Sequence, residues 1–219
     1  MGIEIDLLKN YPKTKRNIKE RGATKSEADR NLARKFGKEF FDGDRTHGYG
    51  GFSYNAKYWQ PVVPTFKKHW NLTKKNSILD VGCAKGFMLY DFSQLIEGLT
   101  VCGVDVSKYA IENCHEVMHP HLKVADARSL PFPDSSFDYV ISITTIHNLE
   151  GEDLKTSLRE IERVSRLGAF ITVDAYRTEE EKKAMYAWNL TAKTILHVDE
   201  WKELFEKVGY TGDYFWFMP

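Results

Sequence analysis

The second part of the chain, from residue 77 onward, alternates short apolar runs with segments whose apolar residues recur at helical spacing. The runs predict buried strands and the spaced segments predict helices, because side chains repeat every two residues in a strand and about every 3.6 residues in a helix. The predicted strands span residues 77–81, 100–106, 122–125, 137–143, 169–173 and 214–218. The predicted helices span residues 87–96, 154–164, 179–188 and 198–208. This alternation indicates βαβ units and an α/β fold built on a parallel sheet.

The first 75 residues follow a different pattern. Thr24 and Glu27 have the spacing of a capping box, which predicts that a helix starts at Thr24. A second short helix is predicted from about Pro61 to Trp70, because proline suits the first turn of a helix. Four glycines between these helices interrupt regular structure: Gly43, Gly48, Gly50 and Gly51. We therefore predict an N-terminal helical lid over residues 1–75 and a core domain over residues 76–219.

The balance of charge narrows the range of partners. The chain of 219 residues has 31 Lys and Arg against 31 Asp and Glu, so its formal net charge is zero. This argues against a dedicated nucleic-acid-binding protein. Residues 9–38 nevertheless hold eleven basic and three acidic residues, which makes the stretch either a solvated helix face or a local contact for RNA. Nucleic acid is therefore not the expected main partner.

Apolar runs and cysteines indicate the compartment. No apolar run approaches the ~18 residues that span a bilayer, so no membrane association is expected. The N-terminal residues lack the basic and apolar regions of a signal peptide. The three cysteines show neither a zinc nor a disulfide pattern, which favours a reducing compartment. Together these features predict a cytoplasmic protein.

The stretch from Ile78 to Gly86 carries the first chemical signal. An apolar strand with an acid, Asp80, near its end leads through a glycine-containing turn into a predicted helix. Ligands of α/β sheets bind beyond the carboxyl ends of the strands, and glycines allow the backbone to approach them. The turn reads G-x-A-x-G, a poor match to the dinucleotide pattern, and a carboxylate here would repel a pyrophosphate but suits an ammonium group. The turn therefore favours another adenosine cofactor over a nicotinamide dinucleotide.

Acidic residues also end the next two strands. Asp105 lies nineteen residues after Gly86, where an acid binds ribose hydroxyls in adenosine-cofactor folds. Asp126 ends the third strand and suits an adenine amino group. The motifs L-D-V-G-C-A-K-G, V-D-V-S and A-D-A, followed by L-P-F-P-D-S-S-F-D-Y-V-I-S, come in this order between residues 76 and about 175. In this order and spacing they resemble the class I S-adenosylmethionine-dependent methyltransferases, particularly their small-molecule branch.

The resemblance implies a fold, a cofactor and a set of binding residues. The fold is a Rossmann-like, doubly wound seven-stranded sheet with a reversed last strand at residues 214–218. The cofactor is S-adenosyl-L-methionine. Ala84 stands where the family often has glycine, and Lys85 is a charge within the loop that would pair with the cofactor carboxylate or point to water. The implied cofactor-binding residues are Asp80, Gly82, Ala84, Gly86, Asp105, Val106, Asp126, Ala127, Ser142 and Ile143.

Candidate catalytic and acceptor-binding residues lie after the fourth strand and in the lid. His147 follows that strand, where this family's acceptor meets the methyl group, and an imidazole there could act as a general base. His47 in the lid is a second candidate, and Asp174 at the end of the fifth strand also points toward the crevice. No His or acid pair has a metal-ligand spacing, so no metal is expected. The predicted acceptor-binding residues are Arg45, Tyr49, Tyr54, Asn148 and Arg177.

The predicted function is methyl transfer to a small polar acceptor. We favour O-methylation of a sugar, phosphate-type or carboxylate compound, by analogy with enzymes of surface-polysaccharide and secondary metabolism. The alternatives are an RNA or protein methyltransferase, a nicotinamide-dependent oxidoreductase and a non-catalytic relative that binds cofactor only. The helix predicted at 179–188 either completes the pocket or forms a homodimer contact.

Overall fold

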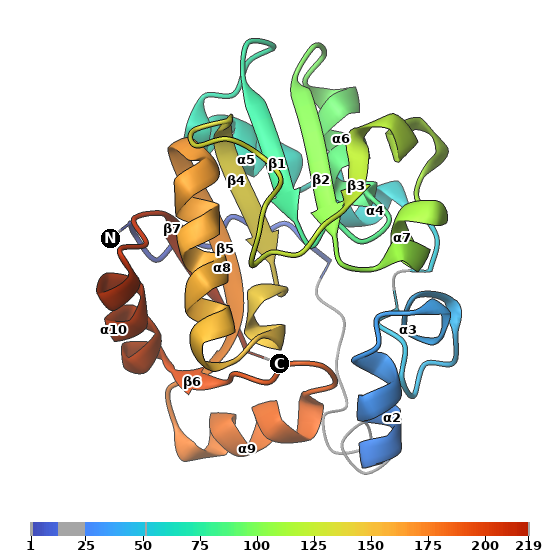
Figure 1. The fold of residues 1–219 in the computed structure, drawn as a ribbon, viewed down its shortest axis with the longest axis vertical. Coiled ribbons are helices and arrows are strands. Elements are labelled where there is room, and N and C mark those ends of the chain that lie inside the picture. The colour runs from blue at the N-terminus through green and yellow to red at the C-terminus, as the bar shows by residue number, and fades with distance from the viewer. Residues whose placement is uncertain (1, 13–24, 51, 219) are drawn as a thin grey trace.

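The computed structural model describes residues 2–12, 25–50 and 52–218. Its centre is a seven-stranded sheet in the order β3-β2-β1-β4-β5-β6, with β7 paired to β5 (Figure 1). The strands are β1 (Ser77–Val81), β2 (Thr100–Asp105), β3 (Leu122–Val124), β4 (Phe137–Ile143), β5 (Ser165–Tyr176), β6 (Leu196–His197) and β7 (Asp213–Phe217). The predicted Rossmann-like sheet is therefore confirmed.

Helices connect the strands and precede the first of them (Figure 1). Those before β1 are α2 (Glu27–Ala33), α3 (Lys38–Asp42), α4 (Ala56–Trp59) and α5 (Val63–Trp70). Those after β1 are α6 (Phe87–Leu95), α7 (Lys108–Glu112), η1 (Glu116–His121), η2 (Ile146–Asn148), α8 (Gly151–Val164), α9 (Glu179–Trp188) and α10 (Val198–Val208). The predicted helices at 179–188 and 198–208 match α9 and α10.

Two hydrophobic clusters hold helices on opposite faces of the sheet. One joins α8 and α10 to the sheet through side chains such as Leu158 and Trp201. The other joins α5 and α6 to the opposite face, where Phe66 contacts Phe92 and Phe170 with ring centroids 5.6 and 5.4 Å apart. Burial of these rings removes much apolar surface from water, which is the main stabilising contribution to such a core.

The last strand differs from the expectation in its direction. β7 pairs with β5 in parallel, with Phe170 opposite Asp213 and Asp174 opposite Phe217. Helix α10 explains the direction, because it carries the chain back along the sheet before β7 begins, whereas a reversed strand would need a hairpin. The outer edge of β7 is covered in turn by the N-terminal segment, where Ile5 N donates to Tyr214 O at 3.0 Å.

The N-terminal helix begins two residues later than a Thr24 cap would place it. Its N-cap is Ser26, whose hydroxyl accepts from the Asp29 N–H while the Asp29 carboxylate accepts from Ser26 N–H, a complete capping box. Thr24 lies outside the described residues, as does the part of the basic stretch between residues 13 and 24. Helix α2 and helix α3 lie beyond the carboxyl ends of β1 and β2 (Figure 1). Whether residues 1–75 act as a lid stays a prediction.

Within the described ranges, every helix is too short or too polar to cross a membrane.

Candidate functional site

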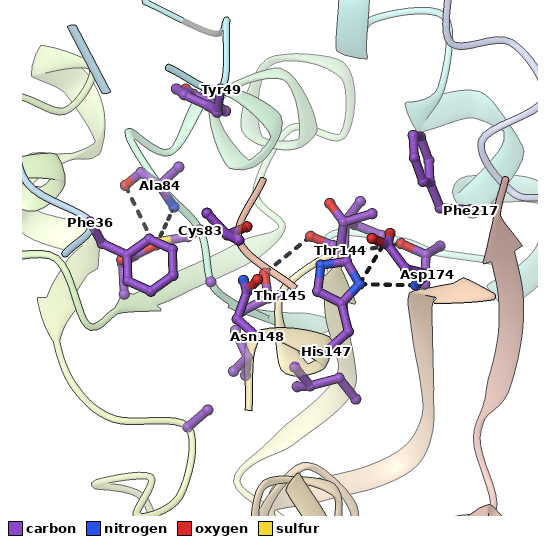
Figure 2. A pocket seen from close by; sticks show the side chains of 18 of the residues that line it. Phe36, Tyr49, Cys83, Ala84, Thr144, Thr145, His147, Asn148, Asp174 and Phe217 are labelled. Atoms are coloured by element: carbon purple, nitrogen blue, oxygen red, sulfur yellow. Dashed lines mark hydrogen bonds and ion pairs between the residues drawn. The ribbon is translucent and has the colours of Figure 1, made fainter. Parts of the chain in front are cut away.

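A large cavity opens at the carboxyl ends of β1, β2, β4 and β5 (Figure 2). Its volume is about 1330 Å³, which exceeds the ~300–1,000 Å³ of a typical ligand pocket. Eight of the ten predicted cofactor residues line it: Asp80, Gly82, Ala84, Asp105, Val106, Asp126, Ala127 and Ile143. His147, Asn148 and Tyr49 also line it, so one space joins predicted cofactor and acceptor residues.

The turn after β1 has a backbone that only particular residues accept. Gly82 has φ +89°, and a Cβ built on it would lie 2.1 Å from Thr145 Oγ1, so no side chain fits. Ala84 has φ +49°, an uncommon value for a residue with a side chain. The Ala84 N–H donates to Asp105 Oδ2 at 2.9 Å, which ties the turn to the end of β2. The turn therefore brings the backbone of β1 and the acid of β2 to the same edge of the cavity.

Asp105 is held in a fixed orientation at the cavity edge. Its two oxygens accept from Ala84 N and from Ser107 N, at 2.9 and 2.8 Å. Burial raises the pKa of this carboxyl, although both N–H donors act in the opposite direction. Each oxygen keeps a further lone pair for a ligand hydroxyl. Val106, the next residue, is 56% exposed and offers an apolar surface beside it.

Asp80 is a buried carboxyl at the cavity floor. In the described part of the chain, no N–H or O–H donates to its side chain, and only 4% of the residue is exposed. Burial, together with the negative charge of Asp105, raises the pKa of Asp80 to about 8. A cationic ligand would supply the missing partner and favour the ionised form.

Asp126 is already paired within the protein. Arg128 Nε and Nη2 donate to its carboxylate at 2.9 and 2.5 Å, and Arg128 Nη1 donates to Asp153 at 2.7 Å. The guanidinium holds the pKa of Asp126 below its usual range. An adenine amino group would therefore share this carboxylate with Arg128.

Two predicted cofactor residues lie outside the cavity wall. Ser142 is fully buried, and its hydroxyl donates to the Val81 carbonyl at 2.9 Å, which joins the ends of β4 and β1. Gly86 is the N-cap of helix α6 with φ +76°, and the side chains of Leu122 and Met118 pack against it. Both residues shape the turn from behind rather than face a ligand.

His147 and Asp174 lie side by side where β4 and β5 end (Figure 2). His147 Nδ1 accepts the Asp174 backbone N–H at 2.9 Å and lies 3.2 Å from Asp174 Oδ1. His147 and Asp174 are 4% and 5% exposed. Asn148, the next residue, has a buried Oδ1 without a partner among the described residues. This part of the cavity thus holds several polar groups whose partners are incomplete.

Most of the predicted acceptor residues of the lid lie outside the cavity wall. Tyr49 lines it and stacks on Phe40 with ring centroids 5.3 Å apart. His47 Nε2 instead contacts Glu39 at 3.3 Å, and the Tyr54 hydroxyl donates to buried Asp91 at 2.6 Å. Arg45 is exposed on the surface of the lid. Arg177, after β5, also lies outside the cavity wall and pairs with Glu4 at 2.7 Å.

The structure adds contacts that the sequence did not predict. Lys85 is 5% exposed and pairs with Asp42 of the lid at 2.5 Å, rather than pointing to water. Its Nζ also donates to the Phe52 carbonyl at 2.9 Å. The only sequence signal was the unusual charge inside the glycine-containing turn. The pairing joins the end of helix α3 to the turn that lines the predicted cofactor half.

Basic side chains in and next to helix α2 contact backbone carbonyls at and just after the end of helix α9. Lys25 donates to the Trp188 carbonyl at 2.8 Å, Arg30 donates to the Asn189 carbonyl, and Arg34 donates to the Thr191 carbonyl at 3.4 Å. Cations suit the carbonyl end of a helix. Three residues of the basic stretch therefore make hydrogen bonds within the protein and do not form a purely solvated helix face. Among the described residues, no group of His, Cys, Asp and Glu could hold a metal ion.

Comparisons with known proteins agree with this geometry. The family model described as "Methyltransferase domain" matches residues 79–173, which run from β1 to β5. An O-methyltransferase, resE, of Aspergillus sclerotiorum is 28% identical over 145 residues, 61% of this chain and 54% of that protein. The tRNA (carboxymethyluridine(34)-5-O)-methyltransferase alkbh8 of Xenopus tropicalis is 32% identical over 114 residues, 52% of this chain and 17% of that protein. The chain thus spans about half or less of the length of these relatives.

A solved structure shares the fold. Phosphoethanolamine N-methyltransferase 2 of Haemonchus contortus, in complex with S-adenosyl-L-methionine, superposes with a TM-score of 0.57 at 22% identity. The superposition covers 81% of this chain and 44% of that one. The match over β1 to β5, the sheet and the acids at the strand ends lead to one conclusion. Residues 79–173 form a methyltransferase domain of the class I, S-adenosylmethionine-dependent family.

Proposed function

We propose that this protein transfers the methyl group of S-adenosylmethionine to an oxygen atom of a small polar acceptor. The observation that carries the proposal is the single cavity that joins the acids of β1 and β2 to the polar groups after β4 and β5. Such a continuous space allows a cofactor and an acceptor to meet without water between them.

The residues of the cofactor half fit the cofactor's groups one by one. Asp80 is a buried carboxyl without a donor among the described residues, which suits the ammonium of the methionine end. Asp105 presents two oriented oxygens, which suit the two ribose hydroxyls. Val106 lies exposed beside it, where a flat base would pack. When bound, the sulfonium supplies an electrophilic methyl group, so the chain's own residues mainly orient the reactants and exclude water.

The acceptor half supports a small polar acceptor. Trp188, Phe217 and Tyr49 line the cavity and limit its extent, while His147, Asn148 and Asp174 provide polar contacts. The N-terminal part of the chain contacts the core beside this space, through the pair of Lys85 with Asp42 and through the bond from Lys25 to the Trp188 carbonyl. The O-methyltransferase named above supports oxygen as the accepting atom.

A tRNA acceptor is the second candidate, because one relative methylates tRNA according to its name. Against it, three basic residues of the lid, Lys25, Arg30 and Arg34, donate to carbonyls of this chain. An RNA contact would show as an affinity that falls steeply with salt.

Calorimetry with S-adenosylmethionine, S-adenosylhomocysteine and NAD⁺ tests the proposal first. Micromolar binding of the first two ligands and none of the third is the expected result. An assay for S-adenosylhomocysteine release then compares hydroxylated small molecules with total tRNA as acceptors. Binding of NAD⁺ alone would overturn the proposal, and turnover of tRNA alone would replace the small acceptor with RNA.

A further inference from the structure

Asp174 is a buried carboxyl that the fold leaves without a hydrogen-bond donor. It ends β5, lines the cavity and is 5% exposed. Across residues 2–12, 25–50 and 52–218, no N–H or O–H donates to its carboxyl oxygens, and its polar neighbour is His147 Nδ1 at 3.2 Å. Buried carboxyls without donors are costly and uncommon, so such a group calls for a ligand that donates to it.

A second buried carboxyl shows how this fold treats a structural acid. Asp138 lies at the opposite end of the sheet and is 2% exposed. It accepts from Ser77 N at 3.0 Å and from the guanidinium of Arg166, and these donors hold its pKa below the usual range although burial acts to raise it. The contrast indicates that Asp174 is not there to stabilise the fold.

His147 is oriented as a donor toward the cavity. Its Nδ1 accepts the Asp174 backbone N–H at 2.9 Å, so the lone pair of Nδ1 is in use and the ring proton is on Nε2. The His147 backbone carbonyl accepts from Lys193 N and Thr194 N at 3.0 and 2.9 Å, which fixes the position of the residue. Nε2 has no hydrogen-bond partner in the described ranges, and in this tautomer it carries a proton and cannot take another.

We propose that Asp174, and not His147, accepts the proton of the methyl acceptor, and that the accepting atom, among the oxygen acceptors considered from the sequence, is a hydroxyl oxygen. This proposal rests on the proposed function. In the step, the hydroxyl oxygen forms a bond to the methyl carbon, the carbon–sulfur bond breaks with its electron pair left on sulfur, and the hydroxyl proton passes to the Asp174 carboxylate. His147 is a positioning residue, whose Nε2–H donates to a second oxygen of the acceptor.

The charges that line the cavity exclude the other two acceptor classes considered from the sequence. A carboxylate or phosphate oxygen carries no proton to lose and would be repelled by Asp174 at short range. Four of the five Lys and Arg side chains that line the cavity already pair with acids of this chain: Arg34, Lys85, Arg128 and Lys193. The fifth, Lys35, lies exposed at the rim. No cation pairs with Asp174 in the described residues, so an anionic acceptor atom would lack a counter-charge there.

Two measurements on the protein without acceptor test the proposal. Long-range ¹H–¹⁵N correlation spectra should show the His147 ring neutral with its proton on Nε2, the signal being assigned by its loss in His147→Gln. Asp174→Asn should keep or raise the Tm, whereas the matched control Asp138→Asn should lower it. A His147 ring protonated on Nδ1, or an Asp174→Asn variant as destabilised as Asp138→Asn, would overturn the proposal.

Turnover gives the third measurement, with a methyl hexoside, a hexuronic acid and a hexose 6-phosphate as probes. The hexoside should yield an ether product, and Asp174→Asn should lower kcat by about 10²–10⁴ with unchanged S-adenosylmethionine affinity. His147→Gln should mainly raise KM. A methyl ester product from the acids, or full kcat in Asp174→Asn, contradicts the proposal. Failure of the wild-type protein to bind cofactor contradicts the proposed function instead, and the two acceptor-free measurements then decide on Asp174 by themselves.

Discussion

The two halves of the cavity are built in different ways. In the cofactor half, backbone groups of the two turns that follow β1 and β2 determine the geometry, since the N–H groups of Ala84 and Ser107 orient Asp105. In the acceptor half, the wall comes from segments far apart in the chain, including Tyr11, Trp188 and Phe217. The first half is specified by short motifs at the ends of neighbouring strands, and the second depends on how distant segments pack.

The acids of the cavity differ in how completely they are paired, and each half holds one acid without a donor. Asp105 and Asp126 accept hydrogen bonds from the protein, whereas Asp80 and Asp174 accept none from the described residues. Buried acids without donors store free energy that a ligand can release on binding. The unpaired acid in each half thus marks the place where a ligand's donor group belongs.

Gly82→Ala should have the largest effect, because the cofactor half depends on this backbone. The new Cβ would lie 2.1 Å from Thr145 Oγ1, which is an overlap, and the alanine backbone would have to adopt φ +89°. We expect a loss of about 3 kcal/mol in the free energy of unfolding, measured by urea denaturation. Gly209→Ala is the matched control, since Gly209 has φ +77° with open space around it, and should cost only about 1 kcal/mol. Equal losses in the two variants would mean that the contact with Thr145 is unimportant.

Asp42→Ala should break the link between helix α3 and the turn after β1. Of the acceptors in the described part of the chain, it leaves the ammonium of Lys85, which is 5% exposed, with only the Phe52 carbonyl. We expect a loss of about 2 kcal/mol in the free energy of unfolding, because a buried charge loses its counter-ion. The control Asp134→Ala removes an exposed partner of Arg163 and should change stability by less than about 0.5 kcal/mol. A loss for Asp42→Ala no greater than that of the control would show that the pair contributes nothing.

Asp105→Ala should weaken cofactor binding at least tenfold, which corresponds to about 1.4 kcal/mol. The variant removes both oxygens that suit the ribose hydroxyls, and it also removes the acceptor of Ala84 N–H. Asp105→Asn keeps the shape and one acceptor oxygen, so it should lose less than the alanine variant. Calorimetry with S-adenosylmethionine measures both, and an unchanged affinity in Asp105→Ala would refute the ribose assignment.

The sequence predicted the regular part of the fold well, and eight of the ten residues predicted to bind cofactor line one cavity. The limits of β1 and β4 match the apolar runs, because strands buried on both faces are continuous apolar segments. The direction of β7 differed, because strand direction depends on where α10 returns the chain and not on the strand's own residues. The acceptor half was predicted least: Arg45 and Tyr54 lie elsewhere, Phe217 was not placed in its wall, and Trp188 was placed there only as one of two alternatives for the helix at 179–188. Long-range packing of aromatic residues leaves no periodic signal in the sequence.

Asp80 links the stability of the ligand-free protein and the affinity for cofactor to pH in opposite directions. Because its pKa is raised to about 8, the folded protein holds a proton there that the unfolded chain releases near pH 3.9. The stabilising effect of that proton is fully present below about pH 4 and is lost as the pH rises toward 8. Thermal unfolding of the ligand-free protein should therefore show a stability that falls with rising pH over this window, and Asp80→Asn should flatten the dependence.

Cofactor affinity should move in the opposite direction, with the smallest of the expected effects. An ammonium binds the ionised form of Asp80, whose fraction rises from about 0.09 at pH 7 to about 0.5 at pH 8 for a pKa of about 8. The affinity for S-adenosylmethionine should then increase about fivefold, or about 1 kcal/mol, over that interval. Calorimetry at both pH values measures the change, and Asp80→Asn corrects for titration of the cofactor's own amino group. An increase of the same size in Asp80→Asn would show that the titrating group is not Asp80. The ammonium of the cofactor would then bind a group other than the Asp80 carboxylate.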